Sequence, residues 1–238
     1  MVSSEINRKV SVILAADVVG YSKHMEENEN ETVKSLRHCE TILKNLLKQY
    51  EGNLFNTGGD SFLIEFPSAV GAVQCAVNFQ KEIKINNEKP GVIIPLEFRI
   101  GINSGDVVKQ GKNYLGDGVN IAARLEALSQ KGGVTISKNI YDYVKGKTEL
   151  KYNDLGVQKV KQNQFHAFDI LIDSSHRRKL RSQKSPLAVI VFCTLILAVI
   201  ISAITYLQFY KKDQTIVYTE SNLPVILIMP FKNLTNSA

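Results

Sequence analysis

Two aspartates occupy positions where a carboxylate could do more than interrupt an apolar segment. Asp17 ends the apolar run 10–16, and Asp60 follows the glycine pair Gly58–Gly59 in a predicted tight hairpin. Two carboxylates that converge at one edge of a sheet, beside the exposed amides of VVGYS, suit hard divalent cations that carry a polyphosphate. Either aspartate alone is more typical of a turn. The pair therefore indicates a metal-assisted phosphate site if the fold brings the two carboxylates together.

The segments around these aspartates alternate between strand and helix patterns. A buried strand is predicted at 10–17, and apolar residues at helical spacing predict a helix over 30–50. The glycine pair predicts a hairpin over 52–66, and Ser68 is the predicted cap of a second helix. Residues 95–110 predict a further strand pair.

The next hundred residues continue this mixed pattern. We expect a helix over 117–130, two short strands at 133–137 and 151–156 around a helix capped by Ser137, and a closing strand at 164–172. This order predicts an α+β fold, a ferredoxin-like βαββαβ core with extensions, whose helices cover one face of an antiparallel sheet. Because the other face of such a sheet also needs a cover, the packing favours a dimer.

A long apolar segment follows the mixed region. Residues 187–207 carry no charge and consist mainly of Ile, Val, Leu and Ala, which predicts a transmembrane helix rather than a buried core helix. Five basic residues precede it and two follow it; they are Arg177, Arg178, Lys179, Arg181 and Lys184, then Lys211 and Lys212. Because basic residues favour the cytoplasmic side, we expect the N-terminal domain in the cytoplasm and the C-terminal tail outside.

These patterns divide the 238 residues into five expected parts. They are an N-terminal tail (1–8), the mixed α+β domain (9–173), a basic juxtamembrane linker (174–186), the transmembrane helix (187–207) and the start of a truncated extracytoplasmic region (208–238). The net charge of +6 is concentrated in the linker. The composition therefore does not indicate a nucleic-acid-binding surface.

Four sequence blocks carry a family resemblance. The blocks ADVVGYSKHM, NTGGDSFLIEFPSAVGAVQCA, FRIGINSGDVV and YLGDGVNIAARLEAL occur in this order between residues 8 and 172. Together they resemble the signature blocks of the catalytic domain of class III nucleotide cyclases. The chain is most similar to the bacterial branch in which a membrane span and a tetratricopeptide-type region follow this domain, and that region opens with a segment similar to PVILIMPFKNLT.

The resemblance implies roles for the two aspartates and their neighbours. Asp17 and Asp60 match the metal-binding aspartates, and the backbone carbonyl of Val18 matches a further metal ligand. The implied cofactors are two divalent cations per site, Mg²⁺ or Mn²⁺. They would activate the ribose 3′-hydroxyl for in-line attack on the α-phosphorus and neutralise the triphosphate.

Further residues match the family's phosphate and transition-state positions. The resemblance implies phosphate contacts from the backbone amides of three consecutive residues and from two basic side chains: Val19, Gly20, Tyr21, Arg99 and Lys161. It also implies that Asn120 and Arg124 orient the ribose and stabilise charge at the α-phosphate. Their spacing of four residues places both on one face of a helix. In the family the aspartates and this pair belong to opposite subunits, so a homodimer with composite sites is implied.

The two positions that read the base depart from the family pattern. Asn56 stands where adenylate cyclases of this type carry a lysine, and Asn113 stands where they carry an aspartate, threonine or serine. An amide both donates and accepts hydrogen bonds, so these side chains suit the edge of adenine and also suit other bases. The glutamate that marks guanylate cyclases is absent from these positions. Adenine is therefore expected by elimination and by the branch, with ATP as substrate.

The resemblance leads to one expected function and two alternatives. The expectation is an adenylate cyclase that makes 3′,5′-cyclic AMP and pyrophosphate as a homodimer, anchored by one span in a bacterial inner membrane with its catalytic domain in the cytoplasm. The first alternative keeps the chemistry and uses GTP or a pyrimidine nucleotide. The second is an inactive cyclase-homology module that binds nucleotide or dimerises. Retention of both aspartates, Arg99, Asn120 and Arg124 argues against the second alternative.

Overall fold

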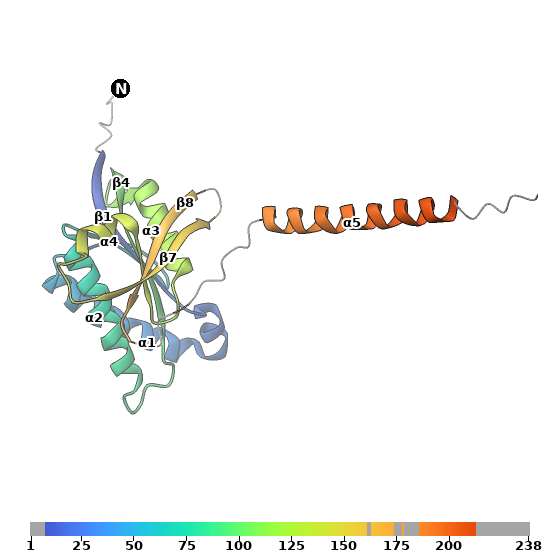
Figure 1. Cartoon of the computed structure of the whole chain (residues 1–238). Helices are drawn as coiled ribbons and strands as arrows, with labels where there is room; N and C mark the ends of the chain where they lie inside the picture. Colours follow the sequence, from blue (N-terminus) through green and yellow to red (C-terminus); the bar gives the residue numbers. More distant parts are fainter. Residues whose placement is uncertain (1–7, 161–162, 174–177, 179–185, 213–238) are drawn as a thin grey trace, which may run out of the picture. The chain divides into compact units, whose positions relative to one another are not determined.

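The computed structural model describes residues 8–160, 163–173, 178 and 186–212. The chain divides into two compact units, one ending at Leu180 and the other beginning at Arg181. The first unit contains a mixed sheet with helices, as Figure 1 shows, and the second contains one long helix. Each unit is described separately below.

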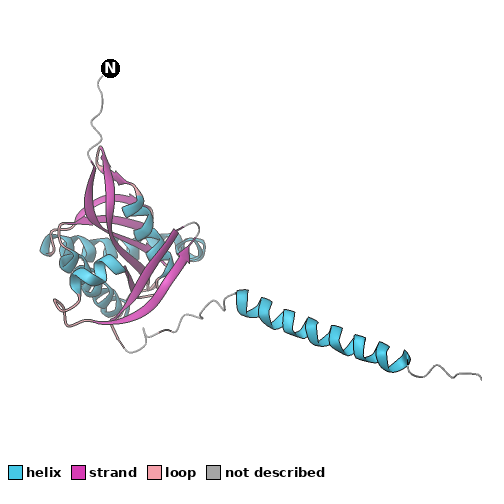
Figure 2. Cartoon of the chain, turned by 45° about the horizontal axis from the view of Figure 1, so that its top comes forward, coloured by secondary structure: helices cyan, strands magenta, loops and turns pink. Residues whose placement is uncertain are grey.

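The first unit is built on a sheet with the strand order β2-β3-β1-β4-β6-β8-β7, and β5 pairs with β4 outside this path. All neighbouring pairs are antiparallel except β4 and β6, which are parallel. Figure 2 shows the strands and helices of this unit by type. The strands are β1 (Arg8–Val18), β2 (Asn53–Gly58), β3 (Ser61–Phe66), β4 (Phe98–Gln110), β5 (Asn113–Leu115), β6 (Val134–Ser137), β7 (Lys151–Val160) and β8 (Asn163–Leu171).

The principal core lies between one face of the sheet and three helices, α1 (Tyr21–Gln49), α2 (Ala69–Asn87) and α4 (Lys138–Val144). Alternate residues of the central strands point into this core, among them Leu14, Ile64, Phe98 and Ile136. The period of two matches a strand with one face buried. The predicted α+β sandwich is therefore confirmed.

The fourth helix, α3 (Asp117–Leu128), covers the opposite face of the sheet. It packs closely on β4, since a Cβ on Gly101 would lie 2.1 Å from the backbone nitrogen of Glu126 and 2.3 Å from the carbonyl oxygen of Ala122. Only glycine allows this approach of helix to strand. The expectation that all helices share one face is thus wrong, because α3 occupies part of the second face.

The strand pair predicted over 95–110 is also wrong. Residues 98–110 form the single strand β4, which pairs with β1 along its length and with the short β5 at its end. Gly105 is not a turn residue; a Cβ there would lie 3.1 Å from the Cα of Gly118, so this glycine admits the start of α3. A glycine required for close packing resembles a turn signal in the sequence.

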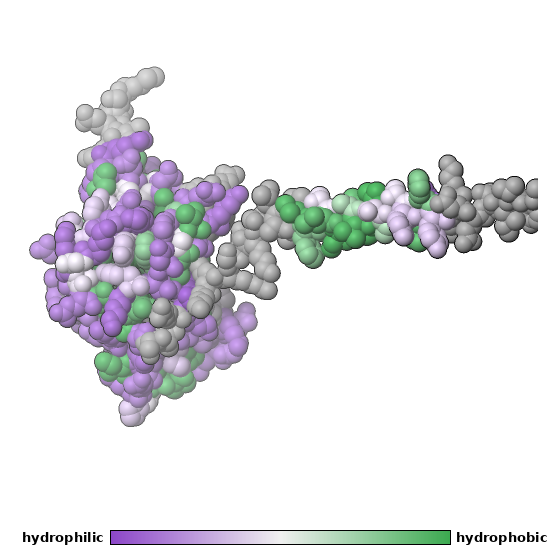
Figure 3. All heavy atoms as spheres, in the orientation of Figure 1, coloured by the Kyte–Doolittle hydropathy of each residue, from purple (hydrophilic) through white to green (hydrophobic). Residues whose placement is uncertain are grey.

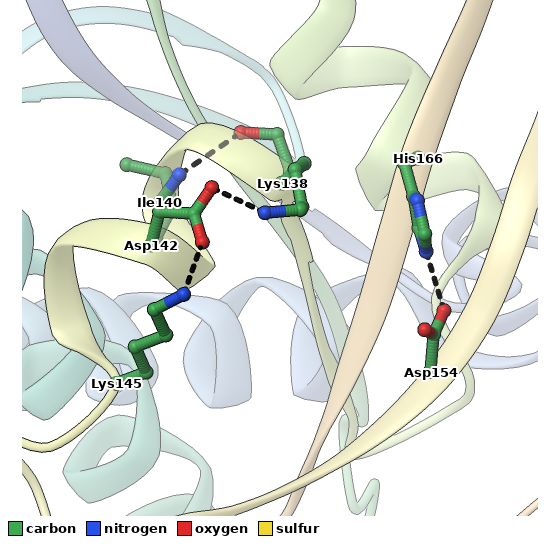
Figure 4. Close-up of polar contacts among 7 residues, drawn as sticks. Lys138, Ile140, Asp142, Lys145, Asp154 and His166 are labelled. Carbon is green, nitrogen blue, oxygen red and sulfur yellow. Dashed lines mark hydrogen bonds and ion pairs between the residues drawn. The ribbon is translucent and has the colours of Figure 1, made fainter.

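The predicted caps of α2 and α4 are both confirmed. The Ser68 hydroxyl accepts a hydrogen bond from the Gly71 amide (3.3 Å), and the Ser137 hydroxyl accepts one from the Ile140 amide (3.4 Å). Figure 4 shows the second cap and, on the exposed side of α4, the Asp142 carboxylate between two lysines.

The β7–β8 hairpin carries its own polar contact. His166 on β8 hydrogen-bonds the Asp154 carboxylate on β7 (Figure 4). The same carboxylate also accepts a hydrogen bond from the Gly156 amide at 2.7 Å. The Gly156 contact spans a register shift between Asp154 and Gly156, and Gly156 has φ 69°. A glycine at positive φ is the usual way to accommodate such a bulge.

The second unit contains α5 (Pro186–Lys212). Within it, Val191–Tyr210 has a mean hydropathy of 2.2 and none of this stretch is buried. Figure 3 shows the apolar side chains along this helix. By length and composition, α5 is the one helix among the described residues that could cross a membrane.

Candidate active site

The two aspartates lie at the same end of the sheet. Asp17 is the penultimate residue of β1 and pairs in register with Ser61 on β3. Asp60 is the residue before Ser61, in the β2–β3 turn, and Gly59 next to it has φ 71°. Burial raises the pKa of Asp60, a backbone hydrogen bond opposes this rise, and the negative charge of Asp17 adds to it. The Asp17 carboxylate is therefore close enough to Asp60 to interact with it electrostatically.

These two carboxylates fit a hard divalent cation. Carboxylate oxygens are the donors that Mg²⁺ and Mn²⁺ prefer, and a lone cation usually takes its other ligands from backbone, water or substrate. Among the described residues no three His, Cys, Asp or Glu side chains are grouped as a metal site. A cation held by Asp17 and Asp60 would thus need further oxygen ligands, for which the Val18 carbonyl is adjacent in sequence.

The chain turns directly from β1 into the N-terminus of α1. Gly20 is the N-cap residue, with φ 68° and ψ 27°, and no side chain caps the helix. The first turn contains no acidic residue. Uncapped amides at a helix N-terminus, together with the helix dipole, form an anion site. This end of α1 lies three residues from Asp17, so an anion site and the carboxylate pair are neighbours.

The amides predicted to bind phosphate are not equally open. The Val19 amide donates to the Glu97 carbonyl oxygen at 2.9 Å, so in this structure it is already engaged. Gly20 and Tyr21 begin the helix, and neither of their amides donates to a backbone carbonyl of the described residues. Of the three amides predicted to bind phosphate, those of Gly20 and Tyr21 are therefore the ones available to a ligand.

Arg99 on β4 lies beside Asp17, because the two residues are partners in the β1–β4 ladder. We call Asp17, Asp60, Arg99 and their charged neighbours the aspartate cluster. Its Nη2 donates to the Asp17 Oδ2 at 2.8 Å, and its Nε lies 3.0 Å from the Glu126 Oε1 on α3. Burial raises the pKa of Glu126 to about 7, although the positive charge of Arg99 works in the opposite direction. The guanidinium thus lies between two carboxylates from different elements.

Glu126 is a residue of this cluster that the sequence reasoning missed. It falls inside the block that carries the family resemblance, two positions after Arg124, but a glutamate on a helix usually faces solvent. Its side chain is only 12% exposed. The signal that could have found it is the glycine at 101, because a strand glycine marks close approach of another backbone.

The predicted transition-state pair lies on α3. Asn120 is exposed, and Arg124 is half-buried one turn later. The Arg124 Nη1 is buried without a hydrogen-bond partner, as are the Arg99 Nε, the Glu126 Oε1 and the Ser129 hydroxyl oxygen. Such orphaned atoms are uncommon in folded proteins, and here they gather on α3 and its contact with β4.

The two predicted base-reading asparagines are brought to one region of the fold. Asn56 on β2 and Asn113 on β5 are both exposed. Their neighbours Phe55 and Tyr114 are buried and pack edge to face, with ring centroids 5.0 Å apart. The two strands are therefore adjacent in space although they do not pair. Lys161, the last predicted site residue, lies outside the described residues.

The lining of a cavity of about 470 Å³ includes neither Asp17 nor Asp60. This cavity is lined by α2, the segment before β4 and the loop before β6, with residues such as Gln80, Lys84, Glu97, Lys131 and Asp173. Two of its lysines are already paired, Lys84 with Asp173 and Lys131 with Glu97.

The fold and the cluster define a class of protein. An α+β sheet that places two carboxylates beside an open helix N-terminus, with an asparagine and an arginine on a packed helix, is the arrangement expected of a nucleotide cyclase catalytic domain. The profile of the adenylate and guanylate cyclase catalytic domain matches residues 2–174. The chain belongs to this family.

Known proteins similar to the chain agree with that assignment. "Putative adenylate cyclase 3" of Rhizobium meliloti (strain 1021) is 40% identical over 162 residues, which is 68% of this chain and 28% of that protein. The chain therefore spans little more than a quarter of this relative's length.

Two solved structures show the same fold. The adenylate/guanylate cyclase/hydrolase from Silicibacter pomeroyi matches with a TM-score of 0.65 and 32% identity, over 71% of this chain and all of that one. The adenylyl cyclase CyaB from P. aeruginosa matches with a TM-score of 0.64 and 26% identity, over 74% of this chain and all of that one.

Proposed function

We propose that the chain is a membrane-anchored adenylate cyclase that converts ATP to 3′,5′-cyclic AMP and pyrophosphate as a homodimer. The observation that carries the proposal is the meeting of Asp17 and Asp60 beside the uncapped N-terminus of α1. The name of the Rhizobium meliloti relative supports adenine as the base.

The Asp17 and Asp60 carboxylates would hold two divalent cations, Mg²⁺ or Mn²⁺, with help from the Val18 carbonyl. When bound, such cations lower the pKa of the ribose 3′-hydroxyl and neutralise the triphosphate. The Gly20 and Tyr21 amides would receive phosphate oxygens, because they open the N-terminus of α1. Arg99 and Lys161 would add positive charge near the triphosphate.

Asn120 and Arg124 would complete the site from a second copy of the chain. Asn120 would orient the ribose, and Arg124 would stabilise the charge that develops at the α-phosphate. Asn120 is exposed on α3 and Arg124 is half-buried one turn later, which supports a role of Asn120 toward a second copy. Because a two-fold interface repeats each contact, the homodimer would have two such composite sites.

The membrane part of the proposal rests on α5 and the charges beside it. The helix is long and apolar enough to span a bilayer. The excess of basic residues before it, in 177–184, favours a cytoplasmic catalytic domain in a single-pass protein of the bacterial inner membrane.

A second candidate keeps this chemistry and changes the base. Asn56 and Asn113 are amides at the two positions expected to read it, and an amide accepts and donates alike. GTP or a pyrimidine nucleotide is therefore the alternative substrate.

The test uses the purified full chain in detergent with Mn²⁺ and each of the four nucleoside triphosphates. Products are identified by mass, and we expect cyclic AMP and pyrophosphate from ATP. The Asp17→Ala and Asp60→Ala variants should lose at least about 100-fold in rate, since metal-ion stabilisation is worth several kcal/mol. A cyclic product only from another nucleotide would support the second candidate. Full activity in either aspartate variant would contradict the metal assignment.

A further inference from the structure

Three charged groups from three elements form a continuous chain at the candidate site. Glu126 on α3 lies 3.0 Å from the Nε of Arg99 on β4, and the Nη2 of Arg99 donates to Asp17 on β1 at 2.8 Å. The middle group is positive and the outer two are carboxylates. Glu126 is the most buried of the three side chains. The helix that bears Arg124 is thus linked electrostatically to the predicted metal ligand.

The backbone holds both ends of this chain in place. Asp17 and Arg99 are direct partners in the β1–β4 ladder, so their side chains share one face of the sheet. Gly101 fixes α3 against β4 at the level of Glu126, because a Cβ there would overlap the Glu126 backbone nitrogen. Arg99 is therefore held within contact distance of both carboxyl groups, those of Asp17 and Glu126.

A second arginine–aspartate pair in the same unit shows what Arg99 would do without Glu126. Arg178 makes two hydrogen bonds to Asp169, from its Nε at 2.7 Å and from its Nη2 at 3.1 Å. This is the fork geometry that an arginine adopts with a single carboxylate, and it engages both carboxylate oxygens. Arg99 instead makes one hydrogen bond to Asp17, through Nη2 and Oδ2.

The difference follows from where the Nε of each arginine is directed. The Arg99 Nε lies 3.0 Å from the Glu126 Oε1 as an ion pair, and among the described residues neither of these buried atoms makes a hydrogen bond. If Glu126 were removed, the buried Nε would also lose its ion-pair partner, and an uncompensated buried charge is costly. Rotation of the guanidinium onto Asp17 would relieve that cost and occupy both oxygens of the carboxylate.

We propose that Glu126 is a positioning residue which, by holding the Nε of Arg99, limits Arg99 to one oxygen of Asp17 and leaves the other oxygen for a divalent cation. This inference rests on the proposed function, because it takes Asp17 as a metal ligand. In this arrangement two nitrogens of Arg99 contact Asp17 and Glu126, and only the remaining nitrogen, Nη1, is available to a phosphate.

The test measures Mn²⁺ binding directly, by the electron paramagnetic resonance signal of the free ion, with the full chain in detergent. The nucleotide is 2′,3′-dideoxy-ATP, which has no 3′-hydroxyl and cannot cyclise. We expect Glu126→Ala to weaken Mn²⁺ binding about tenfold, the lower range for loss of an outer-shell partner. Glu126→Gln should recover part of this loss, because its amide oxygen still attracts the Arg99 N–H. Glu82→Ala, an exposed glutamate on α2, is the matched control and should bind as the parent does.

A double-mutant cycle separates positioning from a general effect on the fold. If Glu126 acts through Arg99, Glu126→Ala should cost nothing further in an Arg99→Ala chain, because the group it holds is gone. Equal costs in both backgrounds would overturn the proposal. Thermal unfolding followed by circular dichroism shows which variants are folded, and Glu126→Gln keeps the test valid if the alanine variant unfolds.

The aspartate variants distinguish failure of this inference from failure of the proposed function. If Asp17→Ala abolishes Mn²⁺ binding while Glu126→Ala and Glu126→Gln leave it unchanged, the positioning role is wrong and the metal site stands. If Asp17→Ala binds Mn²⁺ as the parent does, the metal site itself is wrong, and the positioning role falls with it.

Discussion

Asn56 is the residue at which the chain departs most clearly from the family's adenine-reading pattern, and it permits a direct test. It is exposed on β2 beside the buried Phe55–Tyr114 pair. In Asn56→Lys, a cationic donor would favour adenine, whose N1 accepts, over guanine, whose N1–H donates, and hydrogen bonds to charged groups are about twice as strong as neutral ones. We expect the ratio of kcat/KM for ATP to that for GTP to rise about tenfold.

The measurement is the initial rate of both nucleotides at several concentrations. The conservative control is Asn56→Gln, which keeps an amide and should change the ratio little. A selectivity that stays at the parent value in Asn56→Lys would show that the base is read by other residues.

Glu65 on β3 provides a prediction about pH and stability. Burial tends to raise its pKa, but hydrogen bonds from Lys9, Ser11 and Tyr114 outweigh burial and lower the pKa to about 2. A carboxyl with a lowered pKa in the folded state stabilises the protein above its unfolded pKa and loses this contribution as the pH falls. The free energy of unfolding should therefore decrease between pH 5 and pH 2 by about 1–2 kcal/mol from this group, allowing for the exposure of Lys9.

The check is chemical denaturation of the parent chain and of Glu65→Gln across that pH range. The variant lacks the titrating group, so its stability should fall less steeply with acidification. Parallel curves for the two chains would show that Glu65 is not the source of the pH dependence.

At the scale of elements, the close packing of α3 on β4 depends on one glycine, Gly101. A Cβ at Gly101 would overlap backbone atoms of Glu126 and Ala122, and backbone cannot move aside as a flexible side chain can. Gly101→Ala should lower the free energy of unfolding by about 3 kcal/mol or more, at the upper end for overpacking. Gly71→Ala is the control, since its Cβ would meet its nearest atom at an ordinary 3.5 Å.

The two glycine variants are compared by thermal unfolding of the full chain. A loss of about 3 kcal/mol corresponds to a fall in Tm of roughly 6–12 °C for a domain of this size. If Gly101→Ala unfolds at the same temperature as Gly71→Ala, the close contact between α3 and β4 does not exist in solution.

The basic segment after β8 contributes a second element-scale contact. Arg178 pairs with Asp169, which is almost fully buried and also accepts a hydrogen bond from the Thr135 hydroxyl at 2.7 Å. Arg178→Ala should lower the free energy of unfolding by about 3 kcal/mol, because it leaves a buried carboxylate without its cation. Lys34→Ala, which removes an exposed pair with Glu31, should cost less than about 1 kcal/mol.

Urea denaturation followed by circular dichroism measures both variants. If the Arg178→Ala chain is as stable as the Lys34→Ala chain, the ion pair between Arg178 and Asp169 does not stabilise the protein in solution. The domain boundary predicted at residue 173 remains a prediction, but this contact extends the catalytic unit to Arg178.

The sequence allowed prediction of those elements and residues whose signals are local. Ser68 and Ser137 as caps, the β2–β3 hairpin and the positions of Asp17 and Asp60 all follow from short patterns that act within a few residues. The side of the sheet on which α3 lies could not be predicted, because it depends on contact between segments distant in sequence. Glu126 was missed for the same reason, since its pairing with Arg99 exists only once α3 is placed.

At the scale of the whole molecule, the proposed homodimer would complete the candidate site. Asp17, Asp60 and Arg99 are gathered by β1, the β2–β3 turn and β4, while Asn120 is exposed on α3. An exposed polar residue such as Asn120 would be available to a second copy in the proposed homodimer. The same chain would also carry the membrane helix, so both copies would be confined to one bilayer plane.

Complementation between defective subunits tests this arrangement. Asp17→Ala destroys the metal half of each site, and Arg124→Ala destroys the transition-state half, so each homodimer should be inactive. In a heterodimer of the two, one composite site carries both defects and the other carries none. Chains with different affinity tags, purified through both tags in sequence, should therefore show about half of the parent activity per dimer. Activity no higher than in the two homodimers would mean that each site is built within a single chain, and the homodimeric mechanism would have to be abandoned.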